Sequence, residues 1–373
     1  MSKRVLIHTN FIGGHQLEYI HHFYLGAIKH QENVYIIVAP KRFDTDSKTL
    51  EWPEANNIQV VTYDTPPLMN EGLRTTYHNA KLLGRLVRKY NADEVVVVSL
   101  MEYMPFLPLF VSRKVRVKGI IYRIYLYDWE TEGLAKKIKD GLIYTIFSKF
   151  RVFHEVYMLN DNSAATYLCK LFHTPKYKYL PDPVPLLPEY SGRIIREELG
   201  ISSDKLVLLH PGGMLPYKGT INILKAVEQL NDKYCENLTI VFAGRASAVQ
   251  PEFSIRLEKI QNKIQTLFLE GYLPFEKIAD LFASCDYVLI PYTTNNKSSG
   301  IIGNASFYSK PVVVAKGGVI GKMVRKWKLG YMLPTHSVNS IREFLENIPA
   351  PKEYNNSYAA DHTIEQFVRV VLG

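Results

Sequence analysis

Short apolar runs alternate with amphipathic stretches along the first half of the chain. The runs are rich in Val and Ile and are bounded by polar or proline-containing turns, which is typical of buried strands. They occupy residues 4–9, 33–39, 58–63, 93–100, 118–124 and 152–159, and stretches of helical periodicity lie between them at residues 15–30, 73–90 and 132–150. Strands this apolar predict a parallel sheet that helices cover on both faces.

A cluster of prolines interrupts the alternation. Pro175, Pro181, Pro183, Pro185 and Pro188 lie within fourteen residues, a density that neither a helix nor a central strand accommodates. The pattern then resumes, with predicted strands at residues 205–210, 238–243, 266–270, 286–291 and 311–315 and predicted helices at residues 220–231, 252–264, 275–283 and 301–308. The proline cluster therefore indicates a linker between two units of similar design.

The predicted fold class is α/β, with two doubly wound Rossmann-like domains that face each other across a cleft. We expect an N-terminal domain at residues 1–179, a linker at 180–190 and a C-terminal domain at 191–355. Residues 356–373 are expected to form a tail helix, which could pack back on the first domain. Sheets of this kind bind ligands at the carboxyl ends of their strands, so candidate functional residues are sought in the loops there.

Composition narrows the class of protein. The 373 residues are 47% hydrophobic and 22% charged, which is typical of a globular chain and excludes a disordered or fibrous one. Three cysteines stand far apart without Cys-x-x-Cys or Cys/His spacing, which excludes a disulfide scaffold and a cysteine-based zinc site. The sequence shows no apolar run of the ~18 residues that a membrane span needs and no room for a signal peptide. These features predict a cytoplasmic protein.

The net charge points to anionic partners. The chain carries 45 basic and 36 acidic residues, a net charge of +9, and residues 111–151 alone hold ten basic and four acidic residues. Within that segment Lys136, Lys137 and Lys139 accompany Leu142 and Phe147, so a basic face with an apolar seam could attach to an anionic membrane at its inner face. Alternatively, the seam packs on the sheet and the lysines are its solvated side. No nucleic-acid-binding module is recognisable, and we expect no nucleic acid partner.

The loop between the strand at 205–210 and the following helix could hold a phosphate. Gly212 and Gly213 permit close approach of a ligand to the backbone, and Lys218 stands just before the helix, where the helix dipole favours an anion. An ordinary turn with a solvated lysine is the alternative. The loop at 292–303 is also polar, and Ser299 and Gly300 favour anion or ribose binding over a plain strand-to-helix connection only slightly.

Two features of the first half could act on a second substrate. Gly13, Gly14 and His15 follow the first strand, but they do not form the Gly-x-Gly-x-x-Gly of a dinucleotide site. His15 is either a substrate contact or a packing residue. Asp128 follows the strand at 118–124 among aromatic residues and is either a base that contacts sugar hydroxyls or the N-cap of the next helix.

Four segments in the second half resemble, in order and spacing, the GT-B glycosyltransferases of the large retaining family 4. They are HPGGMLPYKGTINILKAVEQL, LTIVFAGRAS, FEKIADLFASCDYVLIPY and NASFYSKPVVVAKGG. The resemblance implies that a hexose passes from a nucleotide diphosphate sugar to a carbohydrate or lipid-linked acceptor, with retention, without a metal and without a cofactor. It also implies a role in polysaccharide or glycolipid biosynthesis, a donor on the second domain and an acceptor near Gly13 and Gly14.

The resemblance transfers roles to individual residues and also shows departures. Lys218 matches the family's diphosphate-binding lysine, whereas Gly213 stands at the position of the family's arginine, which Arg245 could replace. Asn296 and Asn304 stand where the family has two glutamates, and an amide carries no charge to balance a cationic transition state. A GT-B nucleotide-sugar epimerase and a non-catalytic GT-B binding protein therefore remain alternatives.

Overall fold

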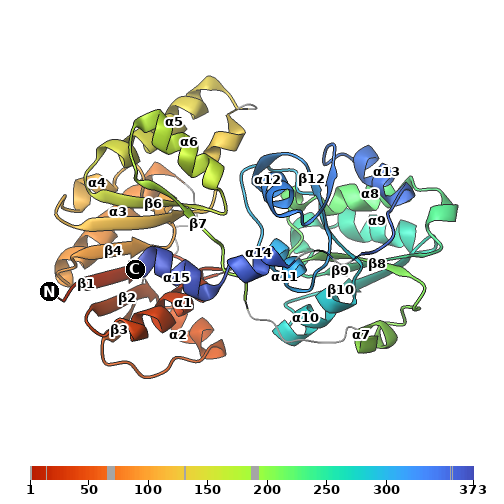
Figure 1. Cartoon of the computed structure of the whole chain (residues 1–373), viewed down its shortest axis with the longest axis horizontal. Coiled ribbons are helices and arrows are strands. Elements are labelled where there is room, and N and C mark those ends of the chain that lie inside the picture. Colours follow the sequence, from red (N-terminus) through yellow and green to blue (C-terminus); the bar gives the residue numbers. More distant parts are fainter. Residues whose placement is uncertain are drawn as a thin grey trace. The chain divides into compact units, whose positions relative to one another are not determined.

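The computed structural model forms two compact units (Figure 1). The first unit contains residues up to Asp182 together with Ile364–Gly373, and the second contains Pro183–Thr363. The structure describes residues 2–13, 15–64, 72–129, 132–185, 193–352, 354 and 356–373.

The first unit is built on a seven-stranded sheet in the order β3-β2-β1-β4-β5-β6-β7, in which all neighbours pair in parallel. Its strands are β1 (Arg4–His8), β2 (Val34–Pro40), β3 (Ile58–Tyr63), β4 (Glu94–Val97), β5 (Arg116–Ile121), β6 (Phe153–Leu159) and β7 (Tyr177–Leu180). Its helices are α1 (His15–Lys29), α2 (Phe43–Asp46), α3 (Leu73–Lys89), α4 (Leu107–Phe110), α5 (Leu134–Lys149), α6 (Asn162–Phe172) and α15 (Ile364–Leu372). Three short 3-10 helices are η1 (Ser47–Thr49), η2 (Leu100–Tyr103) and η3 (Tyr125–Asp128).

The second unit repeats this design with six parallel strands in the order β10-β9-β8-β11-β12-β13. They are β8 (Leu206–Pro211), β9 (Leu238–Ala243), β10 (Gln265–Leu269), β11 (Tyr287–Ile290), β12 (Val312–Ala315) and β13 (Gly330–Leu333). The helices are α7 (Arg193–Glu198), α8 (Thr220–Glu228), α9 (Glu252–Gln261), α10 (Phe275–Ser284), α11 (Ile301–Phe307), α12 (Gly318–Trp327), α13 (Val338–Glu346) and α14 (Ser357–Asp361). The 3-10 helices are η4 (Pro216–Lys218), η5 (Asp232–Tyr234) and η6 (Ser247–Val249).

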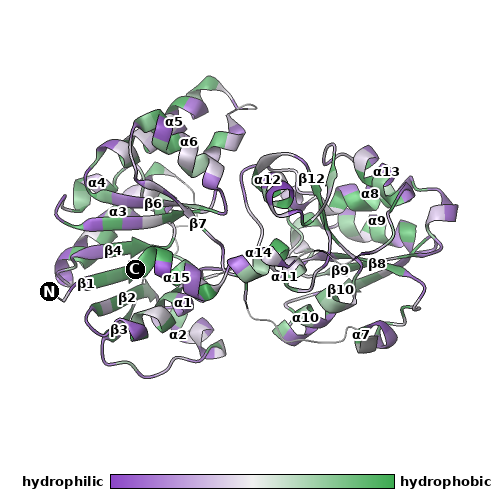
Figure 2. Ribbon diagram, in the orientation of Figure 1, coloured by the Kyte–Doolittle hydropathy of each residue, from purple (hydrophilic) through white to green (hydrophobic). Residues whose placement is uncertain are grey.

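The predicted class of two doubly wound parallel-sheet units is confirmed. Figure 2 shows that the strands of both sheets are largely hydrophobic, as expected for strands covered on both faces. In each unit the strand order reverses beside the first strand, between β1 and β4 and between β8 and β11. Doubly wound sheets bind ligands at this point, outside the carboxyl ends of the two strands.

The sequence analysis misses two strands, β7 and β13, and displaces another. β7 lies between Pro175 and Pro181, inside the proline cluster; it is the edge strand of its sheet, the position at which flanking prolines are tolerated. β5 ends at Ile121, three residues before the predicted end. Of the predicted linker, residues 186–190 lie outside the described residues.

The C-terminal residues are divided between the two units. α14 contacts α11 in the second unit, whereas α15 packs on α1 in the first. Phe367 of α15 lies against Tyr19 and Phe23, with ring centroids 4.7 and 5.0 Å apart. Gly26 makes this approach possible, since a Cβ there would lie 2.2 Å from Val368 Cγ1.

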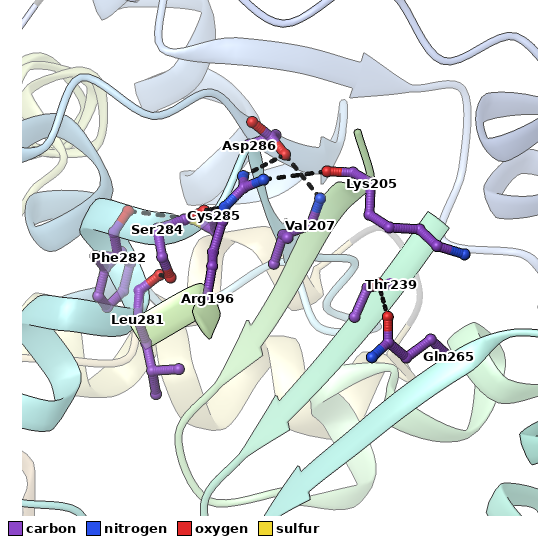
Figure 3. Close-up of polar contacts among 10 residues, drawn as sticks. All are labelled: Arg196, Lys205, Val207, Thr239, Gln265, Leu281, Phe282, Ser284, Cys285 and Asp286. Atoms are coloured by element: carbon purple, nitrogen blue, oxygen red, sulfur yellow. Dashed lines mark hydrogen bonds and ion pairs between the residues drawn. The ribbon is translucent and has the colours of Figure 1, made fainter. Parts of the chain in front are cut away.

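One arginine joins the amino ends of β8 and β11 to α7 (Figure 3). Arg196 Nη2 lies 2.9 Å from Asp286 Oδ2, and its guanidinium also donates to the carbonyls of Ser284 and Lys205 at 2.8 and 3.2 Å. The same Asp286 oxygen accepts the amide of Val207 at 2.7 Å. This edge of the sheet is therefore closed by structural contacts, and the opposite edge is where ligand chemistry is expected.

Candidate functional site

Two loops of the second unit meet where its strand order reverses. Because β8 pairs with β11, the loops that follow these strands start side by side. The amide of Thr293 donates to the carbonyl of Tyr217 at 2.8 Å. Gly219 has a φ of +77°, and a Cβ there would lie 2.2 Å from the carbonyl oxygen of Pro291. The two loops that the sequence analysis predicts to bind ligands therefore lie against each other and form one candidate site.

Gly212 leaves room for the lysine rather than supplying its amide to a ligand. Gly212 has a φ of +88°, and a Cβ there would lie 2.8 Å from Lys218 Nζ. Its N–H donates to the carbonyl of Ala243 at 2.7 Å, so this amide is already used. Gly213 is exposed, and a Cβ there would meet no atom within 4 Å. Gly213 thus borders open space.

Among the described residues, Lys218 is a cation without a counter-charge. Its Nζ lies against Gly212 and 5.7 Å from the centroid of the Tyr292 ring. Within the part of the chain that the structure describes, Lys218 makes no ion pair with a carboxylate. Burial lowers the pKa of Lys218 to about 8, because desolvation penalises the charged form. An anionic ligand would supply the missing charge.

Tyr292 and His210 shape the surroundings of Lys218, and the sequence analysis does not single them out. Tyr292 is buried and shares a hydrogen bond of 3.1 Å with Ser299 Oγ; burial raises its pKa. His210 is also buried and makes hydrogen bonds of 2.9 Å to Leu289 O and Thr220 Oγ1. Burial lowers the pKa of His210 to about 4, so it joins β8, β11 and α8 as a neutral ring. Its only sequence signal is a histidine that ends an apolar strand.

The two asparagines at the family's glutamate positions differ in their surroundings. Asn296 is 1% exposed, and its Oδ1 accepts a hydrogen bond from Thr294 at 2.9 Å. Asn304 lies on α11, and its Oδ1 is buried without a hydrogen-bond partner among the described residues. A buried polar atom without a partner is rare in folded proteins. The side-chain oxygen of Asn304 thus lacks a hydrogen-bond partner among the described residues, whereas that of Asn296 accepts a hydrogen bond within its own loop.

Three other predicted donor residues lie at the border of the site. Ser299 is buried, and its hydroxyl is engaged by Tyr292. Gly300 is the N-cap of α11. Arg245 has an exposed side chain, and its carbonyl accepts the amide of Met214 at 2.7 Å. Arg245 fixes the loop through its backbone, and its guanidinium is available to an approaching ligand.

In the first unit, His15 lies where the sequence predicts it, at the start of α1. It is 54% exposed, and its Nδ1 lies 3.3 Å from Glu18 Oε2. Gly13 is in close contact with the Phe11 ring, since a Cβ there would lie 2.7 Å from two of its atoms. Gly14 lies outside the described residues.

Asp128 is a buried carboxylate held by two cations. Arg123 Nη2 lies 3.3 Å and Lys136 Nζ 3.4 Å from Asp128 Oδ2. The alternative that Asp128 is a helix N-cap is wrong, because the N-cap of α5 is Gly133 and Asp128 ends η3. This leaves Asp128 with a carboxylate that two basic side chains orient near the carboxyl end of β5.

The described residues contain neither a cluster of metal ligands nor a membrane-spanning helix. No group of three or more His, Cys, Asp and Glu side chains there could hold a metal ion. No helix in the same residues is long and apolar enough to cross a membrane.

Comparison with known protein families finds a match within the second unit. Residues 192–359 match the family described as "Glycosyl transferases group 1". The "D-inositol 3-phosphate glycosyltransferase" of Corynebacterium glutamicum (strain R) is 27% identical to this chain over 158 residues, which cover 41% of this chain and 37% of that protein. The chain thus spans little more than a third of the length of this curated relative.

Solved structures match the chain over nearly its whole length. The Anabaena protein Alr3699/HepE "in complex with UDP-glucose" has a TM-score of 0.68 at 14% identity, covering 99% of this chain and 98% of that one. WaaG, "a glycosyltransferase involved in lipopolysaccharide biosynthesis", has a TM-score of 0.69 at 14% identity, covering 99% and 100%. At this identity the likeness shows the fold, and the predicted GT-B fold is confirmed.

Proposed function

We propose that this GT-B chain, whose residues 192–359 match the group 1 glycosyl transferases, transfers a hexose from a nucleotide diphosphate sugar to a hydroxyl of a carbohydrate or lipid-linked acceptor. The observation that carries the proposal is Lys218, a desolvated ammonium without a carboxylate partner among the described residues, at the point where the strand order of the second sheet reverses. Such a cation is suited to a diphosphate.

The transfer demands that charge be stabilised at two places. As the bond between the sugar and the diphosphate breaks, negative charge grows on the diphosphate and the sugar becomes cation-like. Lys218 would stabilise the diphosphate directly, with Arg245 approaching from the exposed side. This division of charge needs no metal, and we propose a metal-independent reaction that retains the configuration at the sugar carbon.

Asn304 is the residue that we assign to the hydroxyls of the donor. Its unpartnered Oδ1 accepts a hydrogen bond from a ribose or sugar hydroxyl, and the ligand thereby satisfies a buried polar atom. Because an amide is neutral, Asn304 would position the donor without balancing the positive charge of the transition state. Donor binding would therefore depend on Asn304 more strongly than the rate of the chemical step does.

On the first unit we assign the acceptor to the loop at Gly13 and His15 and to Asp128. His15 is exposed and can contact an incoming hydroxyl, whereas Asp128 is held by Arg123 and Lys136. A carboxylate oriented in this way accepts a hydrogen bond from a sugar hydroxyl without reorganising in the transition state. Both residues would hold the acceptor and orient its reacting hydroxyl.

The test is a thermal-shift screen followed by a transfer assay. UDP-glucose is the first donor to try, because HepE is described in complex with it; GDP-mannose and the free nucleoside diphosphates follow. We expect a donor to raise the melting temperature, since it binds the native state, and to be consumed only when an acceptor is present. Binding that Lys218→Met does not weaken would refute the site.

Two other outcomes would replace the proposed activity. Turnover of the sugar without any acceptor, with the nucleotide still attached, would favour an epimerase. A donor that binds in calorimetry and is never consumed with any acceptor would favour a binding protein, in agreement with the uncharged Asn296 and Asn304.

A further inference from the structure

One helix of the first unit exposes large apolar side chains in a row. Leu134, Ile138 and Leu142 of α5 are 72%, 63% and 57% exposed. They stand four residues apart, so they follow one side of the helix. We call these three residues the α5 stripe. A row of exposed apolar side chains of this kind indicates a surface that binds a protein, a membrane or a ligand.

The α5 stripe is not the face with which α5 covers the sheet. Ile143, Tyr144 and Phe147 are buried, and α5 contacts β6 and α6. At 100° per residue, the directions of these buried side chains centre on the side of the helix opposite Ile138 and Leu142. The sequence alone leaves open whether the apolar residues of α5 form a core seam or an exposed one. In the structure they form both.

Basic side chains border the stripe. Lys139, Lys149 and Arg151 are exposed, and Lys137 is partly exposed; none of the four makes an ion pair within the described residues. The only acidic residue of α5, Asp140, is buried. Exposed charge along this helix is therefore uniformly positive.

Two lysines of the basic segment at residues 111–151 do not contribute to this exposed positive surface. Lys118 is buried, with its Nζ 2.7 Å from Glu94 Oε1 and 2.8 Å from the carbonyl of Val371. Lys136 pairs with Asp128 and Glu132. Charge for a partner therefore comes from the lysines beside the stripe.

More positive charge lies at the C-terminal end of α5. Arg113 and Lys114 are exposed just before β5, while Lys149 and Arg151 lie just before β6. Since β5 and β6 pair in parallel, the starts of the two strands are neighbours. These four side chains extend the positive surface beyond the end of the stripe.

We propose that the α5 stripe and its basic border attach the first unit to an anionic lipid bilayer. Leucine and isoleucine enter the boundary between headgroups and acyl chains, while the flanking lysines reach the lipid phosphates. A second copy of the chain fits this surface poorly, because a two-fold interface would place the same basic side chains against each other. Charge complementarity therefore selects an anionic surface.

The direction of α5 relates this surface to the proposed acceptor site. In a β-α-β crossover the helix starts at the carboxyl edge of the sheet and runs back to the amino edge, so Leu134 lies at the same edge as Asp128. A bilayer along α5 would bring a lipid-linked acceptor to this edge. Attachment itself does not depend on sugar transfer.

The experiment is co-sedimentation of the full chain with vesicles. One set contains phosphatidylcholine alone, and the other contains phosphatidylcholine with about a third phosphatidylglycerol. We expect pelleting with the anionic vesicles at low salt, at least tenfold less with neutral vesicles, and release at high salt because the lysine contribution is screened. Absence of pelleting with anionic vesicles at low salt would overturn the proposal.

Two variants and a matched control separate the stripe from general charge. Leu134→Ser/Ile138→Ser/Leu142→Ser and, separately, Lys137→Gln/Lys139→Gln/Lys149→Gln should each reduce pelleting at least tenfold. The control, Ile255→Ser/Lys259→Gln, changes one exposed apolar and one exposed basic residue of α9 in the second unit and should leave pelleting unchanged.

Two readouts keep this test independent of folding and of the proposed function. Each variant should keep the melting temperature and the nucleotide affinity of the unaltered chain, whatever that affinity is. Serine variants that pellet as before, or that only convert a dimer to a monomer in light scattering, would overturn the lipid assignment in favour of a protein partner. Equal loss in the α9 control would also overturn it.

Discussion

Replacing Lys218 by methionine should stabilise the free protein and weaken its affinity for nucleoside diphosphates. The two effects share one cause. The ammonium of Lys218 is desolvated and has no carboxylate partner among the described residues, so the free protein keeps a charge that the fold does not compensate. Methionine has a similar length and no charge, and it packs well in irregular spaces. If Lys218 had only a structural role, its replacement by methionine would instead lower the stability of the free protein.

The magnitude follows from the displaced pKa. The pKa of Lys218 is lowered from 10.5 to about 8, and each unit corresponds to 1.36 kcal/mol. At pH 7 the lysine is protonated in both states, so the folded state carries a cost of about 3 kcal/mol at most. The Lys218→Met variant should therefore exceed the unaltered protein in free energy of unfolding by up to about 3 kcal/mol at pH 7.

The difference must shrink as the pH rises. Between pH 8 and pH 10.5 the unfolded chain still binds the proton that the folded chain has released, so the unaltered protein gains stability with pH. By pH 9.5 this gain should be about 2 kcal/mol, and the advantage of the methionine variant should fall by the same amount. Affinity for a diphosphate, which needs the ammonium, should weaken in the unaltered protein over the same range.

Urea denaturation at pH 7 and pH 9.5 measures the stability term, and calorimetry with UDP measures the affinity. Loss of one charge-assisted contact should cost about 1.5–3 kcal/mol of binding, roughly a 10- to 150-fold loss of affinity. Lys259→Met, at an exposed lysine of α9, is the matched control and should change neither quantity. A Lys218→Met variant that is less stable at pH 7, or that binds UDP as well as before, would refute the reasoning.

Three further predictions concern other described residues. Asn304→Leu should weaken donor binding about tenfold in calorimetry without lowering the melting temperature, because the lost oxygen is buried without a partner; a large loss of stability would instead mark Asn304 as structural. Arg196→Ala should lower the free energy of unfolding of the second unit by about 2–3 kcal/mol in urea, since it leaves Asp286 without its cation, and an unchanged midpoint would contradict the closing role of that contact. Burial lowers the pKa of His8 and of His210 from 6.5 to about 4. Between these values the unfolded chain binds a proton that the folded chain does not, so the free energy of unfolding is highest above pH 6.5 and falls as the pH falls toward 4. At pH 5 each histidine lowers the free energy of unfolding by about 2 kcal/mol. His8→Phe should reduce the slope of stability against pH in that range, and a slope equal to that of the unaltered protein would contradict this assignment.

The strands of the fold could be predicted because burial on both faces makes them uniformly apolar. The apolar runs alone predict β8, β9 and β11, with each end within one or two residues of the observed strand. β7 escaped because an edge strand between prolines has no such run. The placement of α15 in the first unit depends on contacts such as Phe367 on Phe23, which join residues more than 300 positions apart and leave no local signal.

The candidate site was predictable to the level of loops and not to the level of roles. Glycines before Lys218 indicate close approach to the backbone, but only the structure shows that Gly212 makes room for the ammonium and spends its amide on Ala243. The roles of Asn296 and Asn304 also become distinct only in the structure, because in the sequence both are asparagines at the family's glutamate positions. Tertiary packing gives Asn296 a partner in Thr294 and leaves the Asn304 oxygen without one.

What the sequence by itself determined is which segments are buried and which residue types stand at the ends of strands, because both follow from local periodicity and turn chemistry. What only the tertiary structure decided is how charges are partnered. Lys118, Lys136 and Lys218 are alike along the chain, yet one is neutralised by Glu94, one by Asp128 and Glu132, and one by no carboxylate that the structure describes. Electrostatic roles depend on distances between residues remote in sequence and on the water removed around them, and neither is written in the local pattern.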